Sequence, residues 1–98
     1  MRITLRFKKW LPDLGSVWIL HPTVATENFL SAYENVCVVI AEIEGTRDEV
    51  CMRLVHAAGL HAGQYIGTLY DDEVSWLTAP PAATVEAIRR GWRWIAYL

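Results

Sequence analysis

The stretch VCVVIAEIE, from Val36 to Glu44, decides how the chain must fold. Its first six residues are all apolar and rich in β-branched side chains, and its end alternates apolar with acidic residues. β-branched residues favour strands, and a strand that is apolar at consecutive positions is covered on both faces. We therefore expect a buried strand here. A helix that continues from Thr26 to Glu44 is the rival interpretation.

The next segment, GTRDEVCMRLVHAAGLH from Gly45 to His61, has the pattern of a helix. Thr46 and Glu49 match a capping box, in which two side chains satisfy amide donors of a first helical turn. Apolar residues then recur at helical spacing: Val50, Leu54 and Ala58. Gly59 is suited to the position just past a helix end. We expect a helix between Gly45 and Gly59.

Two strands and a short helix are predicted before the central stretch. RITLRFK, residues 2–8, alternates apolar with basic or polar side chains, which is typical of a half-buried strand. SVWILH, residues 16–21, is a second strand, and the turn residues of LPDLG, residues 11–15, make the two a hairpin. TVATENFLSAYEN, residues 23–35, has N-cap candidates and helical spacing, so we expect a short helix that ends near Asn35.

Two strands and a helix are predicted after residue 63. QYIGTLY, residues 64–70, and EVSWLT, residues 73–78, read as a hairpin around the acidic run DDE, residues 71–73. The run APP, residues 79–81, begins the last helix, because proline is tolerated in a first turn. The core-facing stripe of that helix consists of Val85, Ile88, Trp92 and Ile95.

The predicted element order is β-β-α-β-α-β-β-α. It indicates a single small α+β domain over residues 1–98, with helices packed on one face of a largely antiparallel sheet. The length of 98 residues suits one domain, and a hydrophobic content of 53% excludes a disordered chain. Five tryptophans, four tyrosines and two phenylalanines are more aromatic area than so small a domain readily hides. We expect a partner to cover some of it.

The charge and cysteine content restrict the cellular setting. The net charge is −2, so no global basic surface points to nucleic acid, although the two ends are basic and the middle is acidic. Cys37 and Cys51 lie in apolar runs, and we expect both thiols to be buried, reduced and unreactive. We find neither a signal peptide nor an apolar run long enough to span a bilayer, and expect a cytoplasmic protein without membrane contact.

No motif for catalysis, a cofactor or a metal emerges. Cys51, His56 and His61 are five residues apart, which does not place three ligands on one helix face. The acidic run at residues 71–73 lacks the spacing of a calcium loop, and GLHAGQYIG, residues 59–67, is not a phosphate-binding loop. We therefore expect no catalytic, cofactor or metal site and no enzyme.

The last helix ends in GWRWIAYL, which places Trp94 nearly opposite the core stripe. Tryptophan, tyrosine and arginine are enriched where binding energy concentrates. We expect a protein interface made of Trp94, Tyr97, Arg90, Arg93 and Trp10. The alternative is that Trp94 covers a second part of the same domain, such as the N-terminal strand.

The sequence favours a non-enzymatic protein-binding module, that is a small inhibitor, antitoxin-like or adaptor protein of the kind that phages and other mobile elements encode. Its partner is another protein, and a homodimer is one form of this. The alternative is a nucleic-acid-binding accessory protein that uses the basic and aromatic ends. A small enzyme without a recognisable motif is the third hypothesis.

Overall fold

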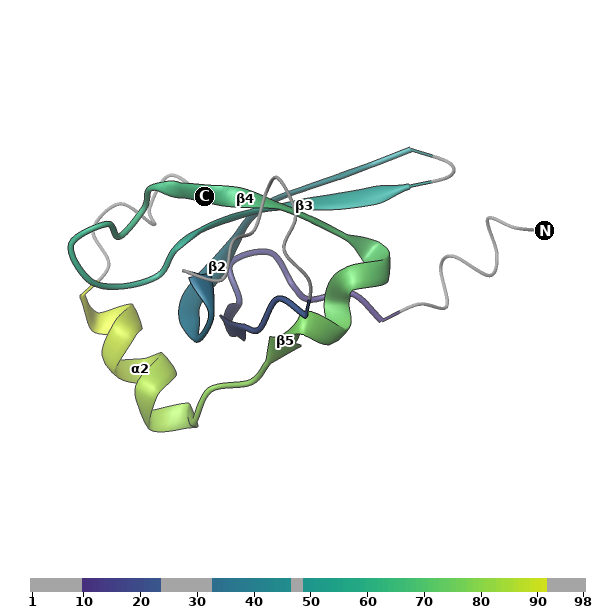
Figure 1. Cartoon of the computed structure of the whole chain (residues 1–98). Helices are drawn as coiled ribbons and strands as arrows, with labels where there is room; N and C mark the ends of the chain where they lie inside the picture. Colours follow the sequence, from purple (N-terminus) through teal and green to yellow (C-terminus); the bar gives the residue numbers. More distant parts are fainter. Residues whose placement is uncertain (1–9, 24–32, 47–48, 92–98) are drawn as a thin grey trace.

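The computed structural model of the chain describes residues 10–23, 33–46 and 49–91. A curled antiparallel sheet shaped like a half-barrel dominates it, with one short α-helix at its side (Figure 1). The strands are β1 (Val17–Leu20), β2 (Val36–Gly45), β3 (Val50–His56), β4 (Tyr65–Tyr70) and β5 (Leu77–Thr78). Their order across the sheet is β4-β3-β2-β1-β5, and every pair is antiparallel.

Strand β2 confirms the expectation of a strand buried on both faces. Val38, Val39 and Ile40 are consecutive and have no exposed surface. Val38 and Ile40 pack into one cluster, whereas Val39 packs into a second cluster on the opposite face. Only a strand with covers on both sides explains three buried residues in a row.

A one-residue register shift divides β2 into two halves. Ile40 lies opposite Leu54, but Glu42 lies opposite Arg53, so Ala41 is an extra residue of the β-bulge type. Strict alternation would have turned Glu42 toward the core. The extra residue instead places Ile43 on the core side, opposite Met52, and leaves the two glutamates on the outer face.

The predicted helix after Gly45 is wrong, because this segment forms β3 and the loop that follows. Met52 and Leu54 face the core with no exposed surface, while Arg53 between them is exposed. Thr46 and Glu49 do contact each other as expected. The Glu49 amide donates to Thr46 Oγ1 at 3.2 Å and the Thr46 amide donates to the Glu49 carbonyl at 2.7 Å. These bonds close the β2–β3 hairpin, so the same local pattern ends a strand here and does not begin a helix.

The predicted hairpin around residues 71–73 is also wrong. The acidic run begins a 3-10 helix, η2 (Asp71–Trp76), in which Glu73 Oε1 accepts from the Tyr70 amide at 2.9 Å. Helix η2 carries the chain across the open side of the curl, so β4 and β5 lie at opposite edges of the sheet. Asp71 is buried at the start of η2, although we expected a solvated turn.

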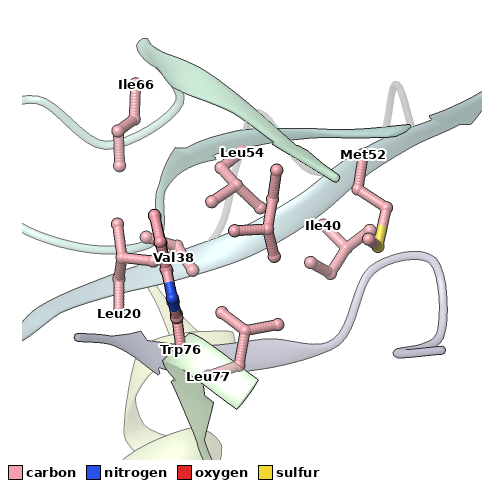
Figure 2. Packing of buried hydrophobic residues seen from close by; sticks show 9 residues of the cluster. Leu20, Val38, Ile40, Met52, Leu54, Ile66, Trp76 and Leu77 are labelled. Atoms are coloured by element: carbon pink, nitrogen blue, oxygen red, sulfur yellow. The ribbon is translucent and has the colours of Figure 1, made fainter. Parts of the chain in front are cut away.

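The main core fills the inside of the curl. Figure 2 shows side chains from β2 and β3 converging with Trp76 and Leu77, which come from η2 and β5. The cluster consists of Leu20, Val38, Ile40, Met52, Leu54, Ile66, Leu69, Trp76 and Leu77. Each large side chain buried here contributes about 1.5–3 kcal/mol relative to its exposed state.

Helix α2 (Ala82–Arg90) confirms the predicted last helix, with Pro81 as its N-cap. Val85 and Ile88 pack against Val17, Val39 and Ala57, on the sheet face opposite the main core. Trp92 and Ile95, the other predicted members of this stripe, lie outside the described residues.

The α+β arrangement with helices on one sheet face and the order β-β-α-β-α-β-β-α is therefore incorrect. The predicted strand at residues 2–8 and most of the predicted helix at residues 23–35 lie outside the described residues. In the described part of the chain, no helix is long and apolar enough to cross a bilayer.

Candidate protein interface

The structure describes two of the five residues that we expected at an interface. Trp10 is exposed over 54% of its surface, and Arg90 is exposed on the last turn of α2. Trp94, Tyr97 and Arg93 lie outside the described residues. Arg89, the residue before Arg90, donates from Nη2 to the Gly15 carbonyl at 3.4 Å, so α2 contacts the segment that follows Trp10.

Trp10 is held in place although it is exposed. Its ring meets the Trp18 ring edge-on, with 5.2 Å between the ring centroids. Trp18 in turn donates from Nε1 to Ser16 Oγ at 2.6 Å, and Ser16 Oγ donates to the Asp13 carbonyl at 2.5 Å. An edge-on aromatic pair adds about 0.5–1.5 kcal/mol beyond area burial. Trp10 is thus an exposed aromatic side chain with a restricted position.

Arg90 belongs to a different kind of surface. Its Nη2 atom lies 2.9 Å from Glu86 Oε1, one helical turn earlier, and both side chains are about 70% exposed (72% and 69%). An exposed pair of this kind contributes about 0.3–0.5 kcal/mol to the helix. Arg90 is accordingly part of a solvated helix face.

The most exposed part of the sheet is the outer end of the β2–β3 hairpin, which projects beyond the other strands (Figure 1). We call residues Ala41–Thr46 of this end the arm. Glu42, Ile43, Glu44 and Gly45 are all exposed, and so is Glu49 across the turn. Ile43 exposes 40% of its surface. The arm combines one large apolar side chain, Ile43, with two carboxylates, and Glu49 across the turn adds a third carboxylate beside it.

Among the described residues, the backbone of the arm has a neighbouring strand on one side only. Strand β1 pairs with β2 from Val36 to Val39, and Gly15 and Ser16 extend this pairing to Ile40 through bonds of 2.7 and 3.1 Å. Gly15 has φ of +81°, a conformation that suits glycine and ends the strand-like run toward the arm. Beyond Ile40, the described residues place only β3 beside β2.

Cys51 of β3 lies opposite Glu44 of the arm, and nearby carboxylates affect its thiol. Burial raises the pKa of Cys51, the carboxylates of Glu44 and Glu49 raise it further, and Arg53 opposes them. Cys51 and Cys37 are free and half-buried, so our expectation of fully buried thiols was too strong. Arg53 Nε lies 3.9 Å from Glu42 Oε1, and its guanidinium lies 4.6 Å from the Tyr65 ring centroid. In the described part of the chain, Glu44 and Glu49 form no such ion pair.

Three polar side chains are linked in series by hydrogen bonds next to the ends of β1 and β5. His21 Nδ1 lies 3.0 Å from Glu34 Oε1, and His21 Nε2 lies 2.9 Å from Thr78 Oγ1. A carboxylate, an imidazole and a hydroxyl in this order are the parts of a nucleophilic triad. Catalysis also needs donors for an oxyanion and exclusion of water. The His21 and Glu34 side chains are 35% and 45% exposed, so we interpret the cluster as a tie between chain segments.

His56 and His61 come together although no helix joins them. Their ring centroids are 5.6 Å apart, and Tyr33 lies 6.1 Å from His56. Burial lowers the pKa of His56, and His61 lowers it further. Within the described ranges, no three histidine, cysteine or acidic side chains are grouped so that they could hold a metal ion.

Comparisons with family models, curated proteins and solved structures find no match to this chain.

The sequence indicated Trp10 but not the arm. The alternation of Glu42, Ile43 and Glu44 was visible as the end of a strand. Whether the edge of the arm is free to pair depends on where β1 ends, and that is known only once the sheet has assembled.

Proposed function

We propose that this chain is a non-enzymatic protein-binding module that acts as an inhibitor, antitoxin-like or adaptor protein in the cytoplasm. The observation that carries the proposal is Trp10, an exposed ring fixed by Trp18. A side chain that is already ordered loses little conformational entropy when a partner covers it. Tryptophan is also the residue type most often found at binding hot spots.

The charge of the described surface favours a protein over a nucleic acid as partner. Its only bases other than histidine are Arg53, Arg89 and Arg90. Its acids are Asp13, Glu34, Glu42, Glu44, Glu49, Asp72, Glu73 and Glu86. A surface of this sign repels phosphate. Of the basic residues behind the nucleic-acid alternative, Arg90 is exposed on α2, and Arg2, Arg6, Lys8 and Arg93 lie outside the described residues.

The test compares tagged wild-type chain with Trp10→Ala in the cells that encode it, followed by titration of the purified partner. Trp10→Ala should weaken the partner's binding by about 2 kcal/mol or more, roughly 30-fold, while the fold persists. Leu60→Ala is the matched control, because Leu60 is 97% exposed on a different loop. Sedimentation of the chain alone tests the homodimer form of the proposal. A protein partner that binds Trp10→Ala as tightly as wild type would contradict the role of Trp10.

A further inference from the structure

We propose that the open edge of the arm binds an extended segment of the partner protein in which apolar residues alternate with lysine or arginine. This inference rests on the proposed protein-binding function and adds the chemistry of the partner. The partner segment would add a sixth strand to the sheet, next to residues 41–45 of β2.

The backbone of the arm offers the hydrogen-bonding groups for such a strand. In an antiparallel ladder, alternate residues direct their N–H and C=O groups to one neighbour, and the remaining residues direct theirs to the other side. Residues 41–45 have β3 on one side, and no described residue pairs with them on the other. This edge is roughly 17 Å long at ~3.3 Å per residue, which matches a strand of ordinary length. Strand addition at such an edge is a common mode of peptide recognition.

The side chains of the arm define which strand fits. Glu42 and Glu44 lie on the outer face, opposite Arg53 and Cys51 of β3, whereas Ile43 lies on the core side, opposite Met52. A strand added beside β2 would place its side chains next to these, on the same alternating faces. Residues beside the glutamates should therefore be basic, and those beside Ile43 should be apolar. Because Glu42 already lies 3.9 Å from Arg53, Glu44 should attract a basic side chain of the partner more strongly.

The same charges disfavour a second copy of the arm at this edge. Antiparallel pairing of two arms would bring the Glu42 and Glu44 side chains of one copy close to those of the other. Like charges across a strand pair are destabilising, and charged edge residues are a common protection against self-pairing. The other long edge of the sheet, on β4, has the sequence YIGTLY, which has no charge that would define a partner.

The experiment uses the full chain and labelled synthetic peptides of about seven residues, followed by fluorescence anisotropy. The test peptide alternates lysine and valine. Three comparison peptides alternate glutamate and valine, scramble the lysine–valine order, or carry N-methyl groups on alternate amides. We expect the alternating basic peptide to bind at least tenfold more tightly than each comparison peptide.

Two double variants with equal charge change identify the site. Glu42→Lys/Glu44→Lys should weaken binding of the basic peptide at least tenfold, whereas Glu34→Lys/Glu86→Lys, at exposed acids before the inner end of β2 and on α2, should change its binding less than threefold. Circular dichroism checks that both variants keep the fold. Equal weakening by the two variants, or equal binding of the scrambled or N-methylated peptide, would reduce the effect to general charge attraction and overturn the proposal.

Failure of this inference is distinguishable from failure of the proposed function. If a protein partner depends on Trp10 but binds Glu42→Lys/Glu44→Lys as well as wild type, the arm proposal is wrong and the protein-binding function stands. If no protein partner depends on Trp10, the function proposal loses its support whatever the peptides do.

Discussion

The two halves of β2 are one strand with two different surroundings. From Val38 to Ile40 the strand has β3 on one side and β1, extended by Ser16, on the other, and all three residues are fully buried. From Glu42 to Gly45, β3 is the one strand that the described residues place beside it, and all four residues are exposed. The extra residue Ala41 separates the halves. The inner half stabilises the fold, and the outer half offers hydrogen-bonding groups to another chain.

Ile40 and Ile43 give the largest expected contrast, because the same residue type occurs on each side of Ala41. Ile40→Ala removes a fully buried side chain and should lower the free energy of unfolding by about 2–5 kcal/mol. Ile43→Ala removes a side chain that is 40% exposed and should cost less than about 1 kcal/mol. Urea denaturation of both variants measures the difference. Equal losses would show that the arm is as much part of the core as the inner half.

The free energy of unfolding should also depend on pH through His56, the last residue of β3 at the inner end of the hairpin. Burial and His61 lower the pKa of His56 in the folded chain, so the unfolded chain takes up this proton first as the pH falls. The contribution to stability is complete above the unfolded pKa of about 6.5 and is lost as the pH falls below it toward the folded value.

His56→Gln should therefore flatten the loss of stability between about pH 6.5 and 5, measured by denaturation at a series of pH values. The effect should be smaller than that of Ile40→Ala. A variant whose stability falls as steeply as wild type over this range would show that another group is responsible.

The smallest expected effect is a change in the labelling rate of the Cys51 thiol, which depends on the charge of the nearby carboxylates. Burial, Glu44 and Glu49 raise the pKa of Cys51, so its labelling by a thiol reagent at pH 8 should be slower than in the denatured chain. Glu44→Gln with Glu49→Gln should speed the labelling, whereas Asp72→Asn should not. Labelling of Cys51 is resolved from that of Cys37 by mass spectrometry of the digested protein. Equal rates in all variants would mean that the carboxylates do not act on the thiol.

The contrast between β2 and β3 shows what could be predicted from the sequence. Val36–Glu44 was recognisable, because a continuous run of β-branched residues fits few arrangements other than a buried strand. Val50–His56 was mistaken for a helix, because Thr46 and Glu49 fit both a helix cap and a hairpin turn. The alternation of Met52 and Leu54 with Arg53 was present, but only pairing with β2 selects it over the helical period.

The candidate site also has one part that could be identified from the sequence and one part that could not. Trp10 was named as an interface residue from its residue type; it is exposed, and its place in an interface stays a prediction. The arm was missed, because an open edge depends on the length of the neighbouring strand. The shift at Ala41 was missed as well, since nothing in VCVVIAEIE marks which residue is the extra one.

Hydrogen exchange of the β2 amides, with and without the alternating lysine–valine peptide, tests the division of this strand most directly. Amides of residues 38–40 should be protected in both states, because these residues lie between two neighbouring backbones and beside the core. Amides of residues 41–45 that point away from β3 should exchange fast in the free chain and become protected when the peptide binds. Protection of those amides in the free chain, or no change at saturating peptide, would contradict the account.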